Sequence, residues 1–328
     1  MKFKRLLLAA SLLSLPFSAL AQEEMSPVSE VSEASLPKQV LTPKVLYQFL
    51  LAEIALGRGQ AGIAAAAYAD LAKETRDPRI ARRAAEVAFY ARQPVMSLDA
   101  AKIWSEADPE SIQARQAYWT LLVNSGKTEE LAESMKSMLA EESVLNRGPA
   151  LMQMGRFLGR FDDKAMAVQV AQKVTEPDLH LPEAHFVRAQ IAYGEGNNAR
   201  ATTELDQALK LKPDWEPAAI LKAQLLIATD PATAIASLAA FVKKYPNARD
   251  ARLAYARALI EGKRYDDARK EFAAMSKAEP DRPELIYSIG LLSLQLGETA
   301  KAEEQLRSLL DKDFPEIDSV HFYLGQIE

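Results

Sequence analysis

The amino-acid sequence predicts an all-α fold, a right-handed α-solenoid of antiparallel helix pairs, from three observations. From residue 41 onward, apolar residues recur at helical spacing, and no segment shows sustained alternation of apolar and polar residues. The prolines fall between these helical windows. The windows repeat with a period of about 34 residues, the length of one helix–turn–helix unit. Because one such hairpin cannot bury its apolar face alone, stacked neighbours must supply the core of this 328-residue chain.

The first 21 residues predict a secretory signal. Three basic residues within positions 2–5 precede an apolar run over residues 6–15, and small residues follow at Ala19 and Ala21. This run is shorter than the roughly 20 apolar residues of a spanning helix, which favours cleavage after Ala21 over a retained anchor. We therefore expect a periplasmic mature chain without a transmembrane segment. Its formal net charge changes from −5 to −8 when the three basic residues are removed.

The next stretch, residues 22–40, predicts a flexible acidic tether. Ser, Pro and Glu dominate it, and its few large apolar residues cannot offset the entropy of ordering. An N-terminal stretch without a role is the alternative. Beyond it we expect less regular repeat units over 41–180, well-formed units over 181–316, and the first helix of an incomplete ninth unit over 317–328. Because this last unit lacks a second helix, we expect the chain to be the N-terminal part of a longer protein.

Residues 182–215 form the most regular unit. Ala189 provides a small side chain where two helices cross, Gly196 follows the first helix, and Pro213 stops the second helix. The next three units repeat this order of residues, and we expect eight helical pairs in all. The pattern resembles the tetratricopeptide repeat, a helix–turn–helix family, and the resemblance covers residues 43–328.

The units nearer the N-terminus follow the same pattern less closely. Ala52 and Tyr68 occupy expected positions in the first of them. The two units over residues 112–180 depart furthest, since Trp119 and Gln153 stand where a small residue is expected. We count these two units as helical pairs because their apolar residues keep helical spacing.

Residues that could carry catalytic or metal chemistry are sparse. The absence of cysteine excludes disulfides, thiol nucleophiles and cysteine-ligated zinc. Gly57, Gly59 and Gly62 match a dinucleotide-binding string, but that motif needs a preceding strand, so we interpret it as a turn between helices. The five-residue spacing of His180 and His185 favours a polar loop over a metal site. We therefore predict no enzyme activity, no metal and no cofactor, and the negative net charge argues against nucleic acid as a partner.

One basic cluster stands out against the acidic background. Arg79, Arg82 and Arg83 are spaced by three and four residues, so they share one face of a predicted helix. Two interpretations remain open for this basic face. The arginines pair with nearby acidic residues such as Glu74 and Glu86, or they receive an acidic partner surface or an anionic polymer.

The family resemblance also implies a concave groove in which proteins or peptides bind. The groove is lined by fixed positions of each first helix, and in this chain those positions alternate apolar and polar side chains, a mixture suited to a peptide. The implied groove residues are Phe186, Gln190, Tyr193, Ile220, Gln224, Ile227, Leu253, Arg257, Ile260, Tyr287, Leu294 and Phe322. The same positions also pack against adjacent first helices, so core packing is the alternative.

Three strings are similar to a narrower group, the tetratricopeptide adaptors of the Gram-negative envelope. They are LAEIALGRGQ (51–60), DPRIARRAAEVAFYA (77–91) and AAKIWSEADPES (100–111). The resemblance implies a periplasmic scaffold that binds a carboxyl-terminal processing protease and presents peptidoglycan hydrolases to it. The chain lacks the lipobox cysteine of lipoprotein members, so the resemblance does not extend to a lipid anchor.

Two other functions compete with this interpretation. The first is an assembly factor for an envelope secretion, pilus or polysaccharide export machine. The second is a protein that binds a cell-wall polymer through Trp104, Tyr118, Trp119 and the basic face.

Overall fold

A computed structural model describes residues 41–327, so the predicted signal (1–21) and tether (22–40) lie outside the described residues. The described part contains seventeen α-helices and no strand. This confirms the predicted fold class, an α-solenoid of antiparallel helix pairs. The helices form two compact units, which we call the N-terminal unit (residues 41–143 with 172–174) and the C-terminal unit (residues 144–171 and 175–327).

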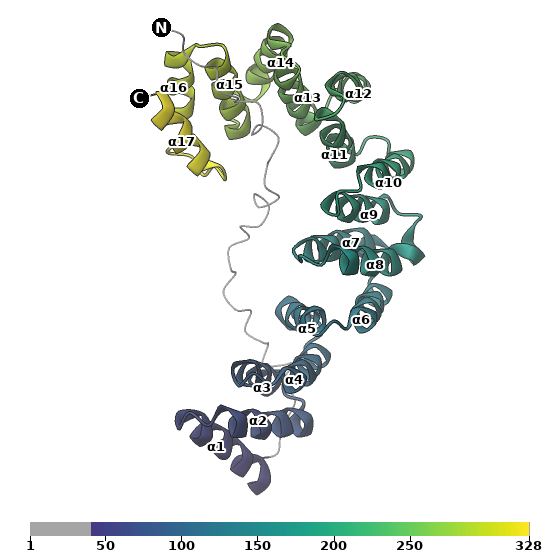
Figure 1. Ribbon diagram of the computed structural model, residues 1–328, viewed down its shortest axis with the longest axis vertical. Coiled ribbons are helices and arrows are strands. Elements are labelled where there is room, and N and C mark those ends of the chain that lie inside the picture. Colours follow the sequence, from purple (N-terminus) through teal and green to yellow (C-terminus); the bar gives the residue numbers. More distant parts are fainter. Residues whose placement is uncertain (1–40, 328) are drawn as a thin grey trace. The chain divides into compact units, whose positions relative to one another are not determined.

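The N-terminal unit consists of three helical pairs (Figure 1). Its helices are α1 (Pro43–Gly57), α2 (Ala61–Thr75), α3 (Pro78–Tyr90), α4 (Pro94–Ala107), α5 (Ile112–Asn124) and α6 (Thr128–Glu141). The glycine string noted in the sequence runs from the end of α1 through the turn into the start of α2, in agreement with its interpretation as a turn between helices. Gly59 has a φ of +74° there, a conformation that residues with a Cβ adopt rarely.

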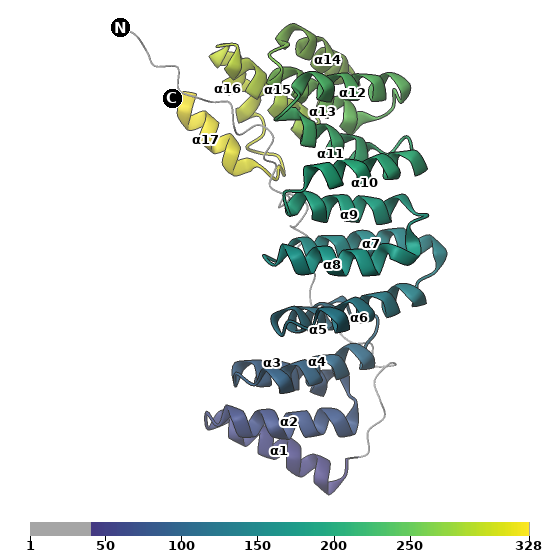
Figure 2. The ribbon, with the colours of Figure 1, turned by 45° about the vertical axis from the view of Figure 1, so that its right-hand side comes forward.

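The C-terminal unit contains the remaining helices (Figure 2). They are α7 (Val144–Gly159), α8 (Lys164–Thr175), α9 (Pro182–Gly194), α10 (Asn198–Leu211), α11 (Glu216–Ile227), α12 (Pro231–Lys244), α13 (Arg249–Glu261), α14 (Tyr265–Ala278), α15 (Pro283–Gln295), α16 (Thr299–Arg307) and α17 (Ile317–Ile327). A short 3₁₀ helix, η3 (Glu176–Asp178), follows α8. Helices α1–α16 are the eight pairs expected from the repeat spacing, and α17 follows them.

Small residues lie where consecutive helices come closest. Ala189 is fully buried, as the repeat pattern predicts, and so are Ala201, Ala208 and Ala256. Because an alanine side chain is small, the two helices can lie close together, and side chains of the partner helix pack against it. The turn after α9 is also as predicted, because Gly196 has a φ of +85°.

In the two least regular units, the helices pack through residues other than the expected small one. Trp119 is buried, and its indole Nε1 donates a hydrogen bond to Ser134 Oγ on α6 at 3.0 Å, so a large side chain fills the space within that pair. Gln153 is exposed on α7. The close approach of α7 to α9 occurs at Gly155 instead, where an added Cβ would lie 2.8 Å from a methyl carbon of Val187.

None of the described helices is both long and apolar enough to cross a bilayer.

Candidate peptide-binding surface

Most of the predicted apolar groove residues are buried within the C-terminal unit. Phe186, Ile227, Leu253, Ile260 and Tyr287 lie in the core, whereas Ile220 and Leu294 are half-buried. Only Tyr193 on α9 and Phe322 on α17 are exposed, at 47% and 59% of their surface. The structure therefore leaves these two aromatic side chains accessible to a partner, and it uses the others for packing.

The buried members connect consecutive units through ring contacts. The rings of Phe186 and Trp215 lie 4.9 Å apart, and Tyr287 lies 5.1 Å from Phe314 and 6.5 Å from Tyr323. Burial raises the pKa of the Tyr287 hydroxyl, so the neutral form is favoured. These tilted arrangements are favourable for aromatic pairs, and they fix the first helix of one unit against the next.

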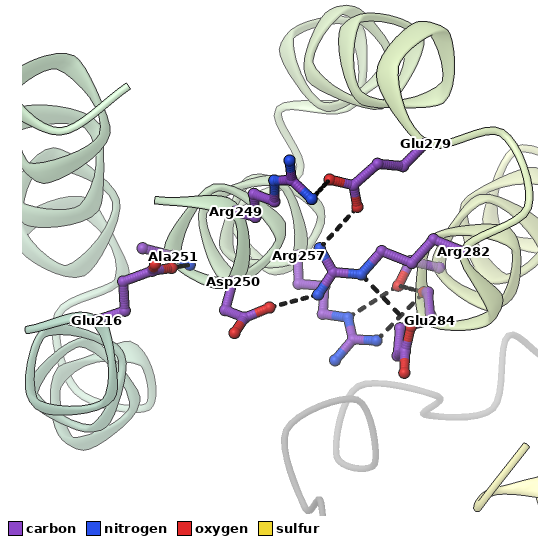
Figure 3. Close-up of polar contacts among 9 residues, drawn as sticks. Glu216, Arg249, Asp250, Ala251, Arg257, Glu279, Arg282 and Glu284 are labelled. Carbon is purple, nitrogen blue, oxygen red and sulfur yellow. Dashed lines mark hydrogen bonds and ion pairs between the residues drawn. The ribbon is translucent and has the colours of Figure 1, made fainter. Parts of the chain in front are cut away.

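The polar groove residues are half-buried, and Arg257 links two first helices. Its Nε donates to Ser288 Oγ at 2.8 Å and its Nη2 to the backbone oxygen of Glu284 at 3.4 Å, so α13 is tied to α15 (Figure 3). Burial lowers the pKa of Arg257. Gln190 and Gln224 are half-buried on α9 and α11.

An open pocket of about 280 Å³ lies beside this link, between α13, α14 and α15, and we call it the Arg252 pocket. Leu253, Met275 and Leu285 form its apolar floor, and three arginines, Arg249, Arg252 and Arg282, form its rim together with Glu279. Each of the three rim arginines has at least one carboxylate partner, and these partners are Asp250, Glu271, Glu279 and Glu284.

Ion pairs hold all three rim arginines. Arg252 Nη1 lies 3.7 Å from Glu271 Oε2, and the pairs of Arg249 and Arg282 are drawn in Figure 3. Arg249 Nη1 lies 2.7 Å from Glu279 Oε1. Arg282 contacts Asp250, Glu279 at 3.3 Å and Glu284 at 3.4 Å, and these carboxylates raise its pKa against the opposing effect of burial. Nearby, Glu216 accepts a hydrogen bond from the backbone N–H of Ala251 at 2.8 Å and so caps the start of α13 from α11.

The repeat pattern did not single out this pocket, although the sequence contains a signal for it. Arg249 and Arg282 precede or begin successive first helices, α13 and α15, one repeat period apart. In a stacked array, equivalent positions of adjacent units lie near each other, so a basic residue that recurs with the period predicts a basic rim. Arg252 carries no such signal, because it lies one turn further along α13 only.

The predicted basic face on α3 is occupied by contacts within the N-terminal unit. Arg79 pairs with Asp77 at 2.7 Å, and Arg82 and Arg83 pair with Glu86 at 2.9 Å and 3.6 Å. The Arg82 guanidinium also lies over the Trp104 ring, 5.7 Å from its centre. Glu74, one of the acidic partners expected from the sequence, pairs with Lys44 instead.

The aromatic residues considered for a cell-wall polymer are not at the surface. Trp104, Tyr118 and Trp119 are all more than nine-tenths buried. Stacking against a sugar needs an open ring face, so these three side chains do not offer a sugar-binding platform in this structure.

Local contacts account for His185, one of the two histidines considered for a metal site. His185 places Nδ1 2.7 Å from Glu204 Oε2 and Nε2 3.1 Å from the backbone oxygen of Leu179. Both ring nitrogens are therefore engaged. Among residues 41–327, no group of three or more His, Asp or Glu side chains is arranged to hold a metal ion.

Comparison with known proteins gives a family match for one part of the chain. Residues 225–289 match the family model of the tetratricopeptide repeat. The chain is 30% identical over 223 residues to the TPR repeat-containing protein PA4667 of Pseudomonas aeruginosa, a match that covers 64% of this chain and 35% of that protein. The chain thus spans about a third of the length of this curated relative.

Solved structures of other repeat proteins are similar as well. A tetratricopeptide repeat protein from Parabacteroides merdae has a TM-score of 0.48 at 12% identity, covering 76% of this chain and 98% of its own. YrrB, described as a TPR protein with an unusual peptide-binding site, has a TM-score of 0.37 at 17% identity, covering 57% and 98%. The family match covers residues 225–289, and the helical pairs of residues 41–327 follow the same helix–turn–helix architecture.

Proposed function

We propose that this protein is a scaffold that binds segments of partner proteins rather than an enzyme. The observation that carries the proposal is the position of the Arg252 pocket in the chain. The Arg252 pocket lies wholly within residues 225–289, the part that matches the tetratricopeptide repeat. Proteins with this repeat generally act as non-enzymatic interaction scaffolds. An open pocket with an apolar floor and charged rim provides the combination of contacts that peptide recognition uses.

We further propose that the scaffold works in the periplasm, where it brings a carboxyl-terminal processing protease together with peptidoglycan hydrolases. The support for this finer proposal comes from the sequence. It consists of the signal-like residues 1–21 and the three strings between residues 51 and 111 that resemble envelope adaptors.

Affinity capture from envelope extract tests both levels of the proposal. The tagged full chain is expected to retain a discrete set of proteins that includes a processing protease and cell-wall hydrolases, identified by mass spectrometry. Recovery of subunits of a secretion, pilus or export machine would instead support the assembly-factor alternative. If no protein is enriched over a tag-only control, the scaffold proposal is wrong.

The periplasmic location has its own test. The mature protein is expected in the periplasmic fraction with its N-terminus at Gln22, as read by intact mass. A cytoplasmic protein that retains residues 1–21 would contradict this location without affecting the scaffold proposal.

A further inference from the structure

We propose that one edge of the N-terminal unit docks on the surface of an anionic lipid bilayer. This edge contains the turn between α1 and α2, the turn between α3 and α4, and the helix ends that these turns join. We call it the Arg92 surface, and its exposed residues are Arg58, Ile63, Phe89, Tyr90, Arg92 and Val95. The inference goes beyond the scaffold function and depends on apolar exposure, on free positive charge and on the backbone of one turn.

The two turns of the Arg92 surface lie side by side. Stacked antiparallel helix pairs place their internal turns at the same edge of the array. The contact between Gly62 and Gln93 shows this directly, because a Cβ added to Gly62 would lie 3.3 Å from Gln93 Nε2. Ile63 follows Gly62, and Val95 follows Gln93 by two residues. Apolar residues from both turns therefore belong to one surface.

Large apolar side chains protrude from this edge. Phe89, Tyr90 and Val95 are 67%, 76% and 72% exposed, and Ile63 in the neighbouring hairpin is 50% exposed. Single exposed apolar residues are common, whereas a group of them at one place indicates a surface that another molecule covers. Aromatic rings are enriched at the level of lipid headgroups, so the Phe89–Tyr90 pair suits a bilayer interface.

The charge at the tips of these turns is positive. Residues 57–63 and 89–96 include two arginines and no Asp or Glu, in a chain with 45 acidic residues. Neither Arg58 nor Arg92 forms an ion pair or a side-chain hydrogen bond with another residue of the described range 41–327. Both guanidinium groups are therefore available to lipid phosphates.

The nearest acidic residues along the chain lie behind the tips. Glu53, Glu86 and Asp99 are three or four residues outside the two stretches, one helical turn or about 5.4 Å along the helix axis. Glu86 is paired with two arginines of α3, and Glu53 accepts a hydrogen bond from the Tyr68 hydroxyl. A flat anionic layer that approaches the tips therefore meets the two free arginines first.

The backbone of Arg92 supports a role for its side chain. Arg92 has a φ of +56°, a conformation that costs free energy in any residue with a Cβ. Lys263 has a similar φ in the turn after α13. Non-glycine residues held in this conformation are frequent at functional sites. Four other turns within helical pairs use glycine at positive φ instead, namely Gly59, Gly126, Gly196 and Gly297.

A bilayer fits this combination better than a folded protein does. Separate side chains that protrude from turns need matching cavities on a protein partner, whereas a fluid headgroup layer closes around them. Apolar side chains next to basic ones are the composition of segments that lie in the membrane interface. Anionic lipid should add roughly fivefold in affinity for each arginine near the surface.

Fluorescence of a single label on the full chain tests where a bilayer is contacted. Because the chain contains no cysteine, the environment-sensitive dye NBD can be attached to Val95→Cys alone. Vesicles of phosphatidylcholine and phosphatidylglycerol should shift its emission to the blue, and high salt should reverse the shift. Vesicles of phosphatidylcholine alone should shift it much less.

Ile112→Cys is the control label in the same unit. Ile112 is 53% exposed and begins α5, beyond the far end of α4. The 14 residues of α4 separate the two ends of that helix by about 20 Å. We expect no blue shift from this position. If the apolar residues 6–15 alone attached the chain to vesicles, position 95 would respond no more than position 112.

Two arginine substitutions provide the specific test and its matched control. Arg92→Gly should lower the affinity for anionic vesicles about fivefold while keeping the fold, because glycine accepts the same φ. Arg76→Gly removes an exposed arginine with a φ of +48° from the turn between α2 and α3, at the opposite edge, where it pairs with Glu106. This control should leave the affinity unchanged, and circular dichroism should match for both variants. The double variant Phe89→Ser, Tyr90→Ser should lose the blue shift at position 95.

Three results would each overturn the inference. They are an unshifted label at position 95 with anionic vesicles, equal shifts at positions 95 and 112, and unchanged vesicle affinity of Arg92→Gly. If vesicles have no effect but a photocrosslinker at position 90 captures an acidic protein, the Arg92 surface docks a protein and the bilayer assignment is wrong. Capture of partner proteins from envelope extract tests the scaffold function separately, so either proposal can fail alone.

Discussion

Asp77 shows how a single residue starts a helix in the N-terminal unit. It lies immediately before α3, is only 3% exposed, and accepts hydrogen bonds from the Arg79 backbone N–H at 2.9 Å and from Arg79 Nε and Nη2 at 3.0 Å and 2.7 Å. Burial alone would raise the pKa of its carboxyl, but the bonds from Arg79 outweigh burial and hold the pKa below its usual value. The charged form is therefore favoured in the folded state.

We predict that Asp77→Ala destabilises the protein by about 1–2 kcal/mol at pH 7, because the substitution removes the cap of α3. The carboxyl has a lower pKa when folded than when unfolded, so its charge stabilises the fold above the ordinary Asp pKa of about 3.9. That contribution is lost as the pH falls through the lowered folded-state pKa. Urea unfolding should therefore show a gap between the two proteins that narrows below pH 4. A gap of equal size at pH 7 and pH 3 would contradict the role of the charge.

The predicted groove residues fall into two groups, buried side chains that pack in the core and exposed side chains that a partner can reach. We predict that Phe186→Ser destabilises the protein by about 3–5 kcal/mol, because Phe186 is buried against Trp215. Tyr193→Ser should change the thermal midpoint little, since the Tyr193 side chain is half-exposed, but should reduce partner capture. Melting curves and capture yields of the two variants check this. Equal destabilisation by both would show that Tyr193 is a packing residue as well.

At the scale of helices, the approach of α7 to α9 depends on Gly155. An added Cβ there would meet Val187 at 2.8 Å, and Val187 is β-branched and adjusts poorly. We predict that Gly155→Ala destabilises the protein by about 1–2 kcal/mol, because overpacking outweighs the better helix propensity of alanine. Urea unfolding followed by circular dichroism measures the change.

Gly159→Ala is the matched control for this prediction. Gly159 ends the same helix and has no atom within 4 Å of an added Cβ, so its substitution should change stability by less than about 0.5 kcal/mol. Val187→Ala should recover part of the loss in the Gly155→Ala background. A Gly155→Ala protein as stable as the unmodified chain would mean that α7 and α9 separate at no cost.

The repeat period predicted the helices and most of their crossing points, because backbone hydrogen bonding and the need for small side chains impose the same spacing on every unit. Ala189 follows that spacing and was found from the sequence. The close approach at Gly155 was not found from the sequence, because Gly155 lies two residues from the expected position at Gln153. A shift of two residues changes which side of a helix faces its neighbour, and only the packing of α7 on α9 decides between them.

At the scale of the whole molecule, the sequence predicted a binding scaffold but did not predict where its binding chemistry lies. The repeat positions marked Phe186, Leu253 and Tyr287 as groove residues, and the structure buries all three. The repeat spacing predicts which positions face another helix. It does not distinguish a helix of the same chain from a helix of a partner. The Arg252 pocket lies between α13, α14 and α15, and its volume depends on how these helices pack, which no spacing of residues encodes.

Site-specific photocrosslinking in cells tests the central claim, that this protein binds other proteins through its repeats, most directly. A benzophenone amino acid replaces Tyr193 on α9 in one protein and Leu211 at the end of α10 in a control, two positions with similar exposure of 47% and 46%. We predict a covalent adduct with one or a few discrete proteins from position 193 and none from position 211. No adduct from either position, or the same adducts from both, would contradict the claim.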